Sequence, residues 1–219
     1  MTHKVYLATP LRGAHIHMAT AATIINFCRD PNLILAQTEK SLNEDVSRTR
    51  SRIAHQFLKT DATHLFFLDA DVSCPPATIH ALLAAERPIV AAPYPKKHTR
   101  KWPKVDPTWY PTGEMEGPFQ PALVPMGCTL IERSVIERMT AAHPELAFGE
   151  VVSGEMVPAL FMLHLGPNPW HPEHPSNMWP EDFSFCLRAH ALGIPSVVHM
   201  GTKAYHWEGS VCFPEEERS

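Results

Sequence analysis

The sequence lacks the cysteine patterns of disulfide-bonded and zinc-stabilised small domains. Its five cysteines are odd in number, lie far apart in a chain of 219 residues and form no CxxC pair. Small secreted scaffolds and zinc ribbons depend on closely spaced cysteines. We therefore expect a reduced protein held together by a hydrophobic core. A hydrophobic content of 44% and a charged content of 19% are typical of a soluble globular protein.

Long apolar runs and a recognisable targeting segment are also missing. No window holds the eighteen or more continuous apolar residues that a membrane helix needs. The first residues, MTHKVYLATP, lack the apolar segment and cleavage site of a signal peptide. We therefore expect a cytoplasmic protein without membrane contact, or one in the host cytoplasm if a phage encodes it. The net charge of −4 argues against non-specific binding of nucleic acid by the surface as a whole.

Strand and helix patterns alternate through the first 92 residues. Strands are expected at 4–10, 32–37, around HLFFLDA and at RPIVAAPY, with helices at 14–28, 43–58 and 75–86 between them. Further on, 124–139 is expected to be a strand turning into a helix, and another helix is expected to run to Gly193. Such alternation predicts an α/β fold with a mainly parallel sheet covered by helices, in one domain over 1–219.

A pair of aspartates follows one of the predicted buried strands, in 63-THLFFLDADVSCPP-76. Residues two apart in an extended chain point the same way, so Asp69 and Asp71 are expected to face one point. Ligands of open α/β sheets bind beyond the carboxyl ends of the strands, where this pair lies. Two such carboxylates favour a hard divalent cation, Mg²⁺ or Mn²⁺. The alternative is that Asp71 or Ser73 caps the next helix.

Several segments, in this order, resemble the small family-2-like GT-A glycosyltransferases of bacteria and phages. They are SRTRSRIAHQFL (47–58), THLFFLDADV, PIVAAPYPKK (88–97), MGCTLIERSVIERM (126–139), PEDFSFCLRAHALGIP (180–195) and AYHWEG (204–209). The resemblance covers most of the chain. It implies a GT-A fold with two lobes, in which 1–100 form the nucleotide-sugar donor half and 101–219 the acceptor half.

The resemblance implies a metal-dependent transfer of a sugar from a nucleotide-diphosphate sugar, with a UDP-sugar as the expected donor. Mn²⁺ or Mg²⁺ would neutralise the leaving diphosphate. The implied metal ligands are Asp69, Asp71 and His206. The implied donor contacts are Pro10, Arg12, Arg50, Asp69, Ala70 and Lys96. The alternatives are a structural role for His206, one of 14 histidines, and a solvated face for the arginines around Arg50.

Glu181 and Asp182, at the start of a predicted helix, are the candidate catalytic pair. By the resemblance, Asp182 would accept the proton of the acceptor hydroxyl in an inverting reaction, and Glu181 would position the acceptor. If the reaction retains configuration, this assignment weakens. The alternative is that both residues only begin the helix, where the macrodipole favours carboxylates. Gly127 is expected to allow close backbone approach near the sugar, or to form a packing turn.

The acceptor is indicated by a basic and aromatic segment, 94–104. Together with Trp179, its residues Lys97, Arg100 and Trp102 are the candidate acceptor contacts, because such residues form platforms for phosphates and bases. We expect an acceptor hydroxyl, for example on a hydroxymethylated base of phage DNA, which would have to be flipped out. The alternatives are a mobile lysine-rich loop, lysines that touch only the donor diphosphate, and a saccharide or protein acceptor.

Other protein classes fit the sequence less well. A sugar nucleotidyltransferase should carry a glycine-rich phosphate loop after the first strand, where this chain has only Gly13. A Rossmann dehydrogenase is disfavoured by the missing GxGxxG. A non-catalytic nucleic-acid-binding module would leave the acidic residues without a purpose. A zinc site at His171, Glu173 and His174 is disfavoured because the intervening prolines prevent a helix that would align the ligands.

Overall fold

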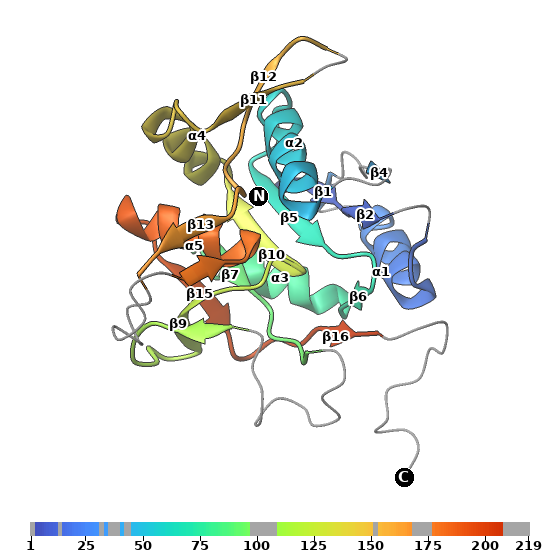
Figure 1. Ribbon diagram of the computed structural model, residues 1–219. Coiled ribbons are helices and arrows are strands. Elements are labelled where there is room, and N and C mark those ends of the chain that lie inside the picture. Colours follow the sequence, from blue (N-terminus) through green and yellow to red (C-terminus); the bar gives the residue numbers. More distant parts are fainter. Residues whose placement is uncertain are drawn as a thin grey trace.

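An eight-stranded sheet runs through the computed structural model, which describes residues 3–12, 15–30, 33–34, 40–41, 45–96, 109–150, 153–167 and 177–207 (Figure 1). Its strand order is β3-β1-β5-β10-β7-β15-β9-β8. The strands are β1 (His3–Ala8), β3 (Leu33–Ile34), β5 (His64–Leu68), β7 (Ile89–Ala91), β8 (Tyr110–Pro111), β9 (Phe119–Leu123), β10 (Cys128–Glu132) and β15 (Ser196–His199).

Most strands of this sheet point the same way. β1 is parallel to β3 and β5, and β7 is parallel to β15. β10 is antiparallel to both β5 and β7, and β9 is antiparallel to β15 and β8. β3, β1, β5, β7, β15 and β8 therefore share one direction, and β10 and β9 oppose it. This confirms the predicted α/β fold with a mainly parallel sheet.

Among the described residues, five helices cover the sheet on both faces. They are α1 (Met18–Cys28), α2 (Val46–Leu58), α3 (Pro76–Ala84), α4 (Arg133–Ala142) and α5 (Glu181–Ala191). One core holds Phe57 of α2, Met139 of α4 and Phe185 of α5, and the other holds Phe27 of α1 and Leu82 of α3. Successive residues of β5 alternate between these cores, as side chains of a strand covered on both faces must. None of the described helices is long and apolar enough to cross a membrane.

The smaller strands form two-stranded pairs around the main sheet. β2 (Leu11–Arg12) pairs with β4 (Lys40–Ser41), and β11 (Ala147–Gly149) pairs with β12 (Met156–Pro158). β13 (His164–Gly166) pairs with β14 (Asn177–Trp179), which leads directly into α5. β6 (Val72–Ser73), just after the aspartate pair, is antiparallel to β16 (Tyr205–His206). Residues 205–206 thus lie beside the segment that follows β5.

Two helices, α1 and α2, begin later than the sequence patterns predict, each after a residue whose side chain caps it. α1 starts at Met18, after His17, whose Nδ1 accepts a hydrogen bond from the Ala19 N–H. α2 starts at Val46, after Asp45, whose carboxylate accepts from the Ser47 N–H. Of the strand predicted at 32–37, Leu33–Ile34 is confirmed, and 35–39 lie outside the described residues.

Candidate functional site

The aspartate pair lies in a turn, and its two carboxylates contact different partners. β5 ends at Leu68, and the Val72 N–H donates to the Asp69 carbonyl at 3.0 Å. Because the chain is turned here, the alternation of an extended strand does not apply. The extended-strand argument for Asp69 and Asp71 facing one point is therefore wrong, and that the two carboxylates share a ligand stays a prediction. The capping alternative is also wrong, since Pro75 precedes α3 and no side chain caps that helix.

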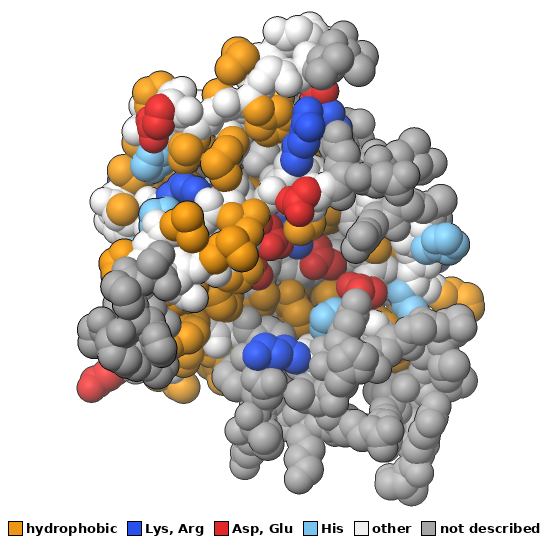
Figure 2. Space-filling model, in the orientation of Figure 1, with side chains coloured by type: hydrophobic (Ala, Val, Ile, Leu, Met, Phe, Trp, Pro, Cys, Tyr) orange, Lys and Arg blue, Asp and Glu red, His pale blue; other side chains and the backbone are white. Residues whose placement is uncertain are grey.

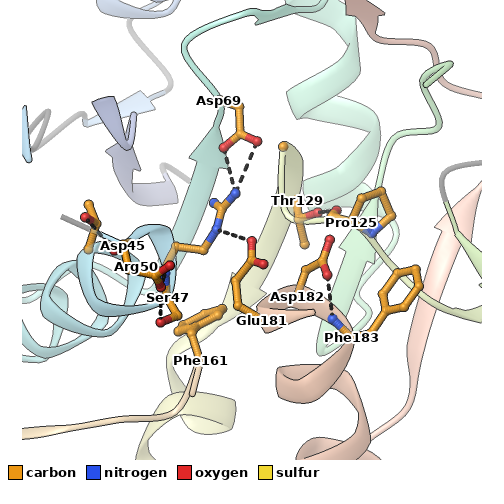
Figure 3. A network of polar contacts seen from close by, with 12 residues as sticks. Asp45, Ser47, Arg50, Asp69, Pro125, Thr129, Phe161, Glu181, Asp182 and Phe183 are labelled. Carbon is orange, nitrogen blue, oxygen red and sulfur yellow. Dashed lines mark hydrogen bonds and ion pairs between the residues drawn. The ribbon is translucent and has the colours of Figure 1, made fainter. Parts of the chain in front are cut away.

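Asp69 is held by Arg50 of α2. Arg50 Nη2 donates to Asp69 Oδ1 at 2.8 Å and to Oδ2 at 3.1 Å, and Arg50 Nε lies 3.5 Å from Glu181 Oε1 (Figure 3). The Arg50 side chain is 3% exposed. The solvated-face alternative for Arg50 is therefore wrong. Its guanidinium joins the end of β5 to the start of α5 and stabilises two carboxylates there.

This arrangement restricts the predicted donor contact of Arg50. The Nη2 and Nε atoms at the edge of the guanidinium lie next to Asp69 and Glu181, respectively. Nη1 makes no hydrogen bond to a described residue, and it is buried. Each guanidinium nitrogen of Arg50 therefore either lies near a carboxylate or is buried, and the present contacts make Arg50 a partner of carboxylates.

Asp182 lies beside this ion pair with a strongly perturbed acidity. Its Oδ1 accepts a hydrogen bond from the Phe183 N–H at 2.8 Å (Figure 3). Burial, and then the negative charge of Glu181, raise the pKa of Asp182 to about 7, although Arg50 opposes the rise. A carboxyl with this pKa exchanges its proton near neutral pH, as a general base or acid must. The helix-start alternative holds only in part, because Pro180 precedes α5 and no side chain caps it.

Asp71 is paired with the histidine that comes from the far end of the chain. His206 Nε2 lies 3.5 Å from Asp71 Oδ1, and His206 Nδ1 lies 3.1 Å from the Pro95 carbonyl oxygen. A carbonyl can only accept, so Nδ1 carries a proton, and in the neutral ring Nε2 presents its lone pair. That lone pair lies close to the negatively charged Asp71 carboxylate. A cation bound by both would make this arrangement favourable.

These two side chains fit a divalent cation. Two ligands that each lie about 2.1 Å from an ion are roughly 3–3.5 Å apart, as the Asp71 and His206 atoms are. The hydrogen bond from Nδ1 to a carbonyl is the usual support of a ligating imidazole. Among the described residues, no three His, Cys, Asp or Glu side chains gather into a complete metal cluster. The ion would therefore need oxygen ligands from a phosphate and from water.

The segment around Asp71 is fixed by stacked rings and backbone hydrogen bonds. The Trp207 N–H donates to the Asp71 carbonyl at 2.8 Å, and Trp207 Nε1 donates to Ser73 Oγ at 2.8 Å. The ring of Trp207 stacks on that of His17, with centroids 5.0 Å apart and planes 8° apart. The His17 N–H donates to the Ala70 carbonyl at 2.7 Å. The turn is therefore clamped between the start of α1 and the chain after β16.

Gly127 lies where no side chain fits. A Cβ there would be 2.3 Å from Tyr94 Oη and 2.9 Å from Asp69 Oδ2. The Gly127 N–H donates to Tyr94 Oη at 3.0 Å, and its carbonyl accepts from the Asp69 N–H at 2.9 Å. The close approach expected of Gly127 is thus made to Asp69 and Tyr94. Tyr94 also packs edge-on against His206, with ring centroids 5.4 Å apart, so it contacts both parts of the site.

Of the other predicted donor contacts, the structure describes Pro10, Ala70 and Lys96. Pro10 is half-buried between β1 and β2, and Lys96 is exposed next to Pro95, whose carbonyl binds His206. Ala70 contributes its carbonyl to the contact with His17. The backbone of Arg12 is in β2, but its side chain lies outside the described residues.

The predicted acceptor contacts are not brought together by the described residues. Lys97, Arg100 and Trp102 lie outside them, as do the three residues of the disfavoured zinc site. Trp179 is 3% exposed and packs against Tyr110 and Phe183, so its ring does not line an acceptor surface. The prediction for Trp179 is corrected for this reason: an aromatic residue before a polar helix start is here part of the core.

Sequence reasoning missed Tyr94, His17 and Trp207 as parts of the site. Tyr94 was assigned to the basic platform, but it is 5% exposed and faces Gly127. The position of Trp207 next to His206 in the sequence is the feature from which its place in the site could have been predicted. On one face of the molecule, Asp and Glu side chains gather in a hollow, with hydrophobic side chains along one side of it (Figure 2).

Comparison with known proteins gives likenesses of structure only. No protein-family profile and no curated protein matches the sequence. Among solved structures, A197 from STIV is similar over 95% of this chain and 87% of that chain, with a TM-score of 0.56 and 16% identity. A glycosyltransferase involved in the glycosylation of the major capsid of PBCV-1 aligns over 98% of this chain and 99% of its own, with a TM-score of 0.45 and 12% identity. The first likeness shows a shared fold, and neither identifies a reaction.

Proposed function

We propose that the protein is a metal-dependent glycosyltransferase that moves a sugar from a nucleotide-diphosphate sugar to an acceptor hydroxyl. The observation that carries this proposal is Asp182, a carboxyl whose pKa is raised to about 7. It lies in one cluster with the Arg50 contacts to Asp69 and Glu181. The Asp71–His206 pair follows in the same turn as Asp69. A proton acceptor and a cation-binding pair at the end of a sheet are what such a transfer requires.

The residues would share the reaction as follows. The acceptor oxygen attacks the anomeric carbon, its proton passes to the Asp182 carboxylate, and the electron pair of the breaking bond stays on the diphosphate. Glu181, fixed by Arg50, would orient the acceptor hydroxyl. The ammonium group of Lys96, near the Pro95–His206 contact, would stabilise the departing negative charge. A divalent cation bound by Asp71 and His206 would supply further charge stabilisation of the diphosphate.

The donor half of this proposal is tested by thermal stability. The protein is heated with UDP-, GDP-, ADP- or CMP-sugars, in Mn²⁺ or in chelator. A ligand at 100 times its Kd adds about 2.7 kcal/mol to the free energy of unfolding. For a domain of this size, this corresponds to a rise in Tm of about 5–10 °C. We expect one nucleotide, with UDP first, to stabilise the protein with Mn²⁺ only.

Three variants give this test its controls. Asp71→Asn and His206→Gln should lose the Mn²⁺-dependent rise. Asp61→Asn, at an exposed aspartate bound to Lys4, should keep it. Stabilisation that is equal in Mn²⁺ and chelator would refute the metal site, and stabilisation by no nucleotide would refute the donor site. Release of UDP from the bound donor would distinguish the transferase from a nucleotidyltransferase, which needs pyrophosphate to form UTP.

The DNA acceptor stays a prediction. It depends on 94–104, of which only 94–96 are described, and Tyr94 is buried rather than available for stacking on bases.

A further inference from the structure

Tyr94 lies between the two parts of the candidate site, and no step of the proposed reaction uses it. It follows the end of β7 by three residues and is 5% exposed. Its side chain belongs to the core that also holds Val72 of β6 and Ala204, which comes just before β16. A buried tyrosine usually finds a hydrogen-bond partner for its hydroxyl, so the contacts of that oxygen show what the residue holds in place.

The chain on either side of Tyr94 is bound to the chain that carries His206. The Ala204 N–H donates to the Pro93 carbonyl at 3.0 Å. His206 Nδ1 lies 3.1 Å from the Pro95 carbonyl oxygen, to which it donates. The two segments therefore lie side by side, with Tyr94 between their points of contact.

The ring of Tyr94 packs edge-on against the imidazole of His206. The ring centroids are 5.4 Å apart, and the planes are inclined by 80°. The hydrogen bond from Nδ1 fixes the imidazole at one atom but does not define the tilt of the ring. The Tyr94 ring restricts that tilt, because it occupies the space beside the imidazole in a close-packed interior. Together the two contacts keep His206 Nε2 3.5 Å from Asp71 Oδ1.

The hydroxyl of Tyr94 acts on the other part of the site, at Asp69. Its oxygen accepts from the Gly127 N–H at 3.0 Å, and the Gly127 carbonyl accepts from the Asp69 N–H at 2.9 Å. A Cβ on Gly127 would be 2.3 Å from Tyr94 Oη and 2.9 Å from Asp69 Oδ2, so the hydroxyl lies close to that carboxylate. These contacts fix the backbone from which Asp69 reaches Arg50.

Resting on the proposed function, we propose that Tyr94 is a positioning residue of the candidate cation site. Its ring orients His206 for the cation, and its hydroxyl, through Gly127, holds the backbone at Asp69. The two roles belong to different atoms, so substitutions can separate them. Groups that orient a ligating imidazole commonly change metal affinity by about 10- to 100-fold when they are removed, although they do not touch the metal.

The first test needs no metal and reports on His206 alone. The protein is labelled with ¹⁵N at the histidine rings, and the His206 signals are identified by their loss in His206→Gln. At about pH 8, where an ordinary imidazole is neutral, wild type should show the tautomer with its proton on Nδ1, as the Pro95 carbonyl requires. Tyr94→Leu should show a mixture of tautomers, whereas Tyr94→Phe, which keeps the ring, should show the wild-type signal.

The second test measures binding of Mn²⁺ alone, from the electron paramagnetic resonance signal of the free ion. Tyr94→Leu should raise the Kd about tenfold relative to wild type, and Tyr94→Phe should leave it unchanged. Tyr6→Leu is the matched control, because Tyr6 is 1% exposed but packs edge-on against Phe57 in the other core. That change should lower the Tm without affecting the His206 tautomer or the Kd.

The hydroxyl has a readout of its own. Tyr94→Phe should speed hydrogen exchange of the Gly127 amide, which loses its acceptor. Unchanged exchange would refute the role of the hydroxyl, and an unchanged tautomer and Kd in Tyr94→Leu would refute that of the ring. Equal effects of Tyr94→Leu and Tyr6→Leu would also overturn the proposal. Tyr94→Met is made in parallel, because its flexible side chain fills the space without a ring and replaces Tyr94→Leu if that variant does not fold.

The outcome is separable from that of the proposed function. If Mn²⁺ binds to wild type but not to His206→Gln, and Tyr94→Leu changes neither the tautomer nor the Kd, only the role of Tyr94 is refuted. If wild type binds no Mn²⁺, but the His206 tautomer is fixed in wild type and mixed in Tyr94→Leu, the cation site is refuted and the orienting contact of Tyr94 stands.

Discussion

Replacing Asp182 by asparagine should make the protein more stable while removing its activity. In the native protein the pKa of Asp182 is raised from 3.8 to about 7, by burial first and by the charge of Glu181 second. Between these two pH values the native protein holds a proton that the unfolded chain has released. The native state therefore binds more protons, and the free energy of unfolding falls as the pH rises from about 4 to about 7. Asparagine does not titrate, so the free energy of unfolding of the variant does not decrease in this way.

The size of the effect follows from the same shift. A rise from 3.8 to about 7 corresponds to about 4 kcal/mol if the whole shift acts on folding. Asp182 keeps partial contact with water, so we expect about 2 kcal/mol, or about 4–8 °C in Tm above pH 7.5. The Phe183 N–H···Oδ1 hydrogen bond can be kept by the asparagine oxygen. The transfer rate should fall about 10²- to 10⁴-fold, because the proton acceptor is gone.

The assay is urea unfolding of wild type and Asp182→Asn from pH 4 to pH 8. The difference in free energy should be near zero at pH 4 and reach its full value above pH 7. Asp61→Asn is the control: the hydrogen bond and charge of Lys4 lower the pKa of Asp61, so its contribution is present above the pKa of the unfolded chain and is lost as the pH falls. That control should show a small effect of opposite sign. A variant no more stable than wild type at pH 8 would refute the reasoning for Asp182.

Three other outcomes follow from the structure. Arg50→Met should lower the free energy of unfolding by about 3 kcal/mol, since it removes a buried guanidinium and leaves two partly buried carboxylates without it. Arg52→Met, at a partly exposed pair, should lower it by about 1 kcal/mol, and equal losses in urea unfolding would contradict this. Gly127→Ala should lower the free energy of unfolding by about 2 kcal/mol, because the added Cβ overpacks the site. Calorimetry should show a smaller decrease when the same change is made in Tyr94→Phe, which lacks the hydroxyl oxygen nearest to that Cβ. Burial lowers the pKa of His64 to about 4, so the unfolded chain binds a proton at a higher pH than the native protein does, and the free energy of unfolding falls as the pH drops from 6.5 to 4. In His64→Gln this fall should be smaller by about 2 kcal/mol. An unchanged slope of stability against pH would contradict this.

The sequence predicts the main strands and helices well because their patterns are long and strongly apolar. The apolar run HLFFL predicts the buried strand β5, and the periodic apolar residues of α2 predict a helix that packs on the sheet. The hairpins β11–β12 and β13–β14 were not predicted, because strands of three residues carry no periodic signal.

The candidate site was predicted in its residues but not in its contacts. The sequence predicts one metal-binding group of Asp69, Asp71 and His206. In the structure Asp69 contacts Arg50, and Asp71 lies close to His206. The burial of Arg50 could not be read from α2, because a charged residue on a helix is usually solvated. Asp69 after β5 and Glu181 at the start of α5 together supply the carboxylates that make its burial favourable.

The pairing of β6 with β16 also bears on when the protein can act during its own synthesis. Domains begin to form from the N-terminal side as the chain emerges from the ribosome. By the time β10 and α4 have emerged, β1, β3, β5 and β7 can already form much of the sheet. His206 and Trp207 arrive after every strand of that sheet. A nascent chain can thus hold most of its core and the contact between His17 and Ala70 before His206 and Trp207 reach the turn, so metal-dependent donor binding is expected only of chains that extend through Trp207.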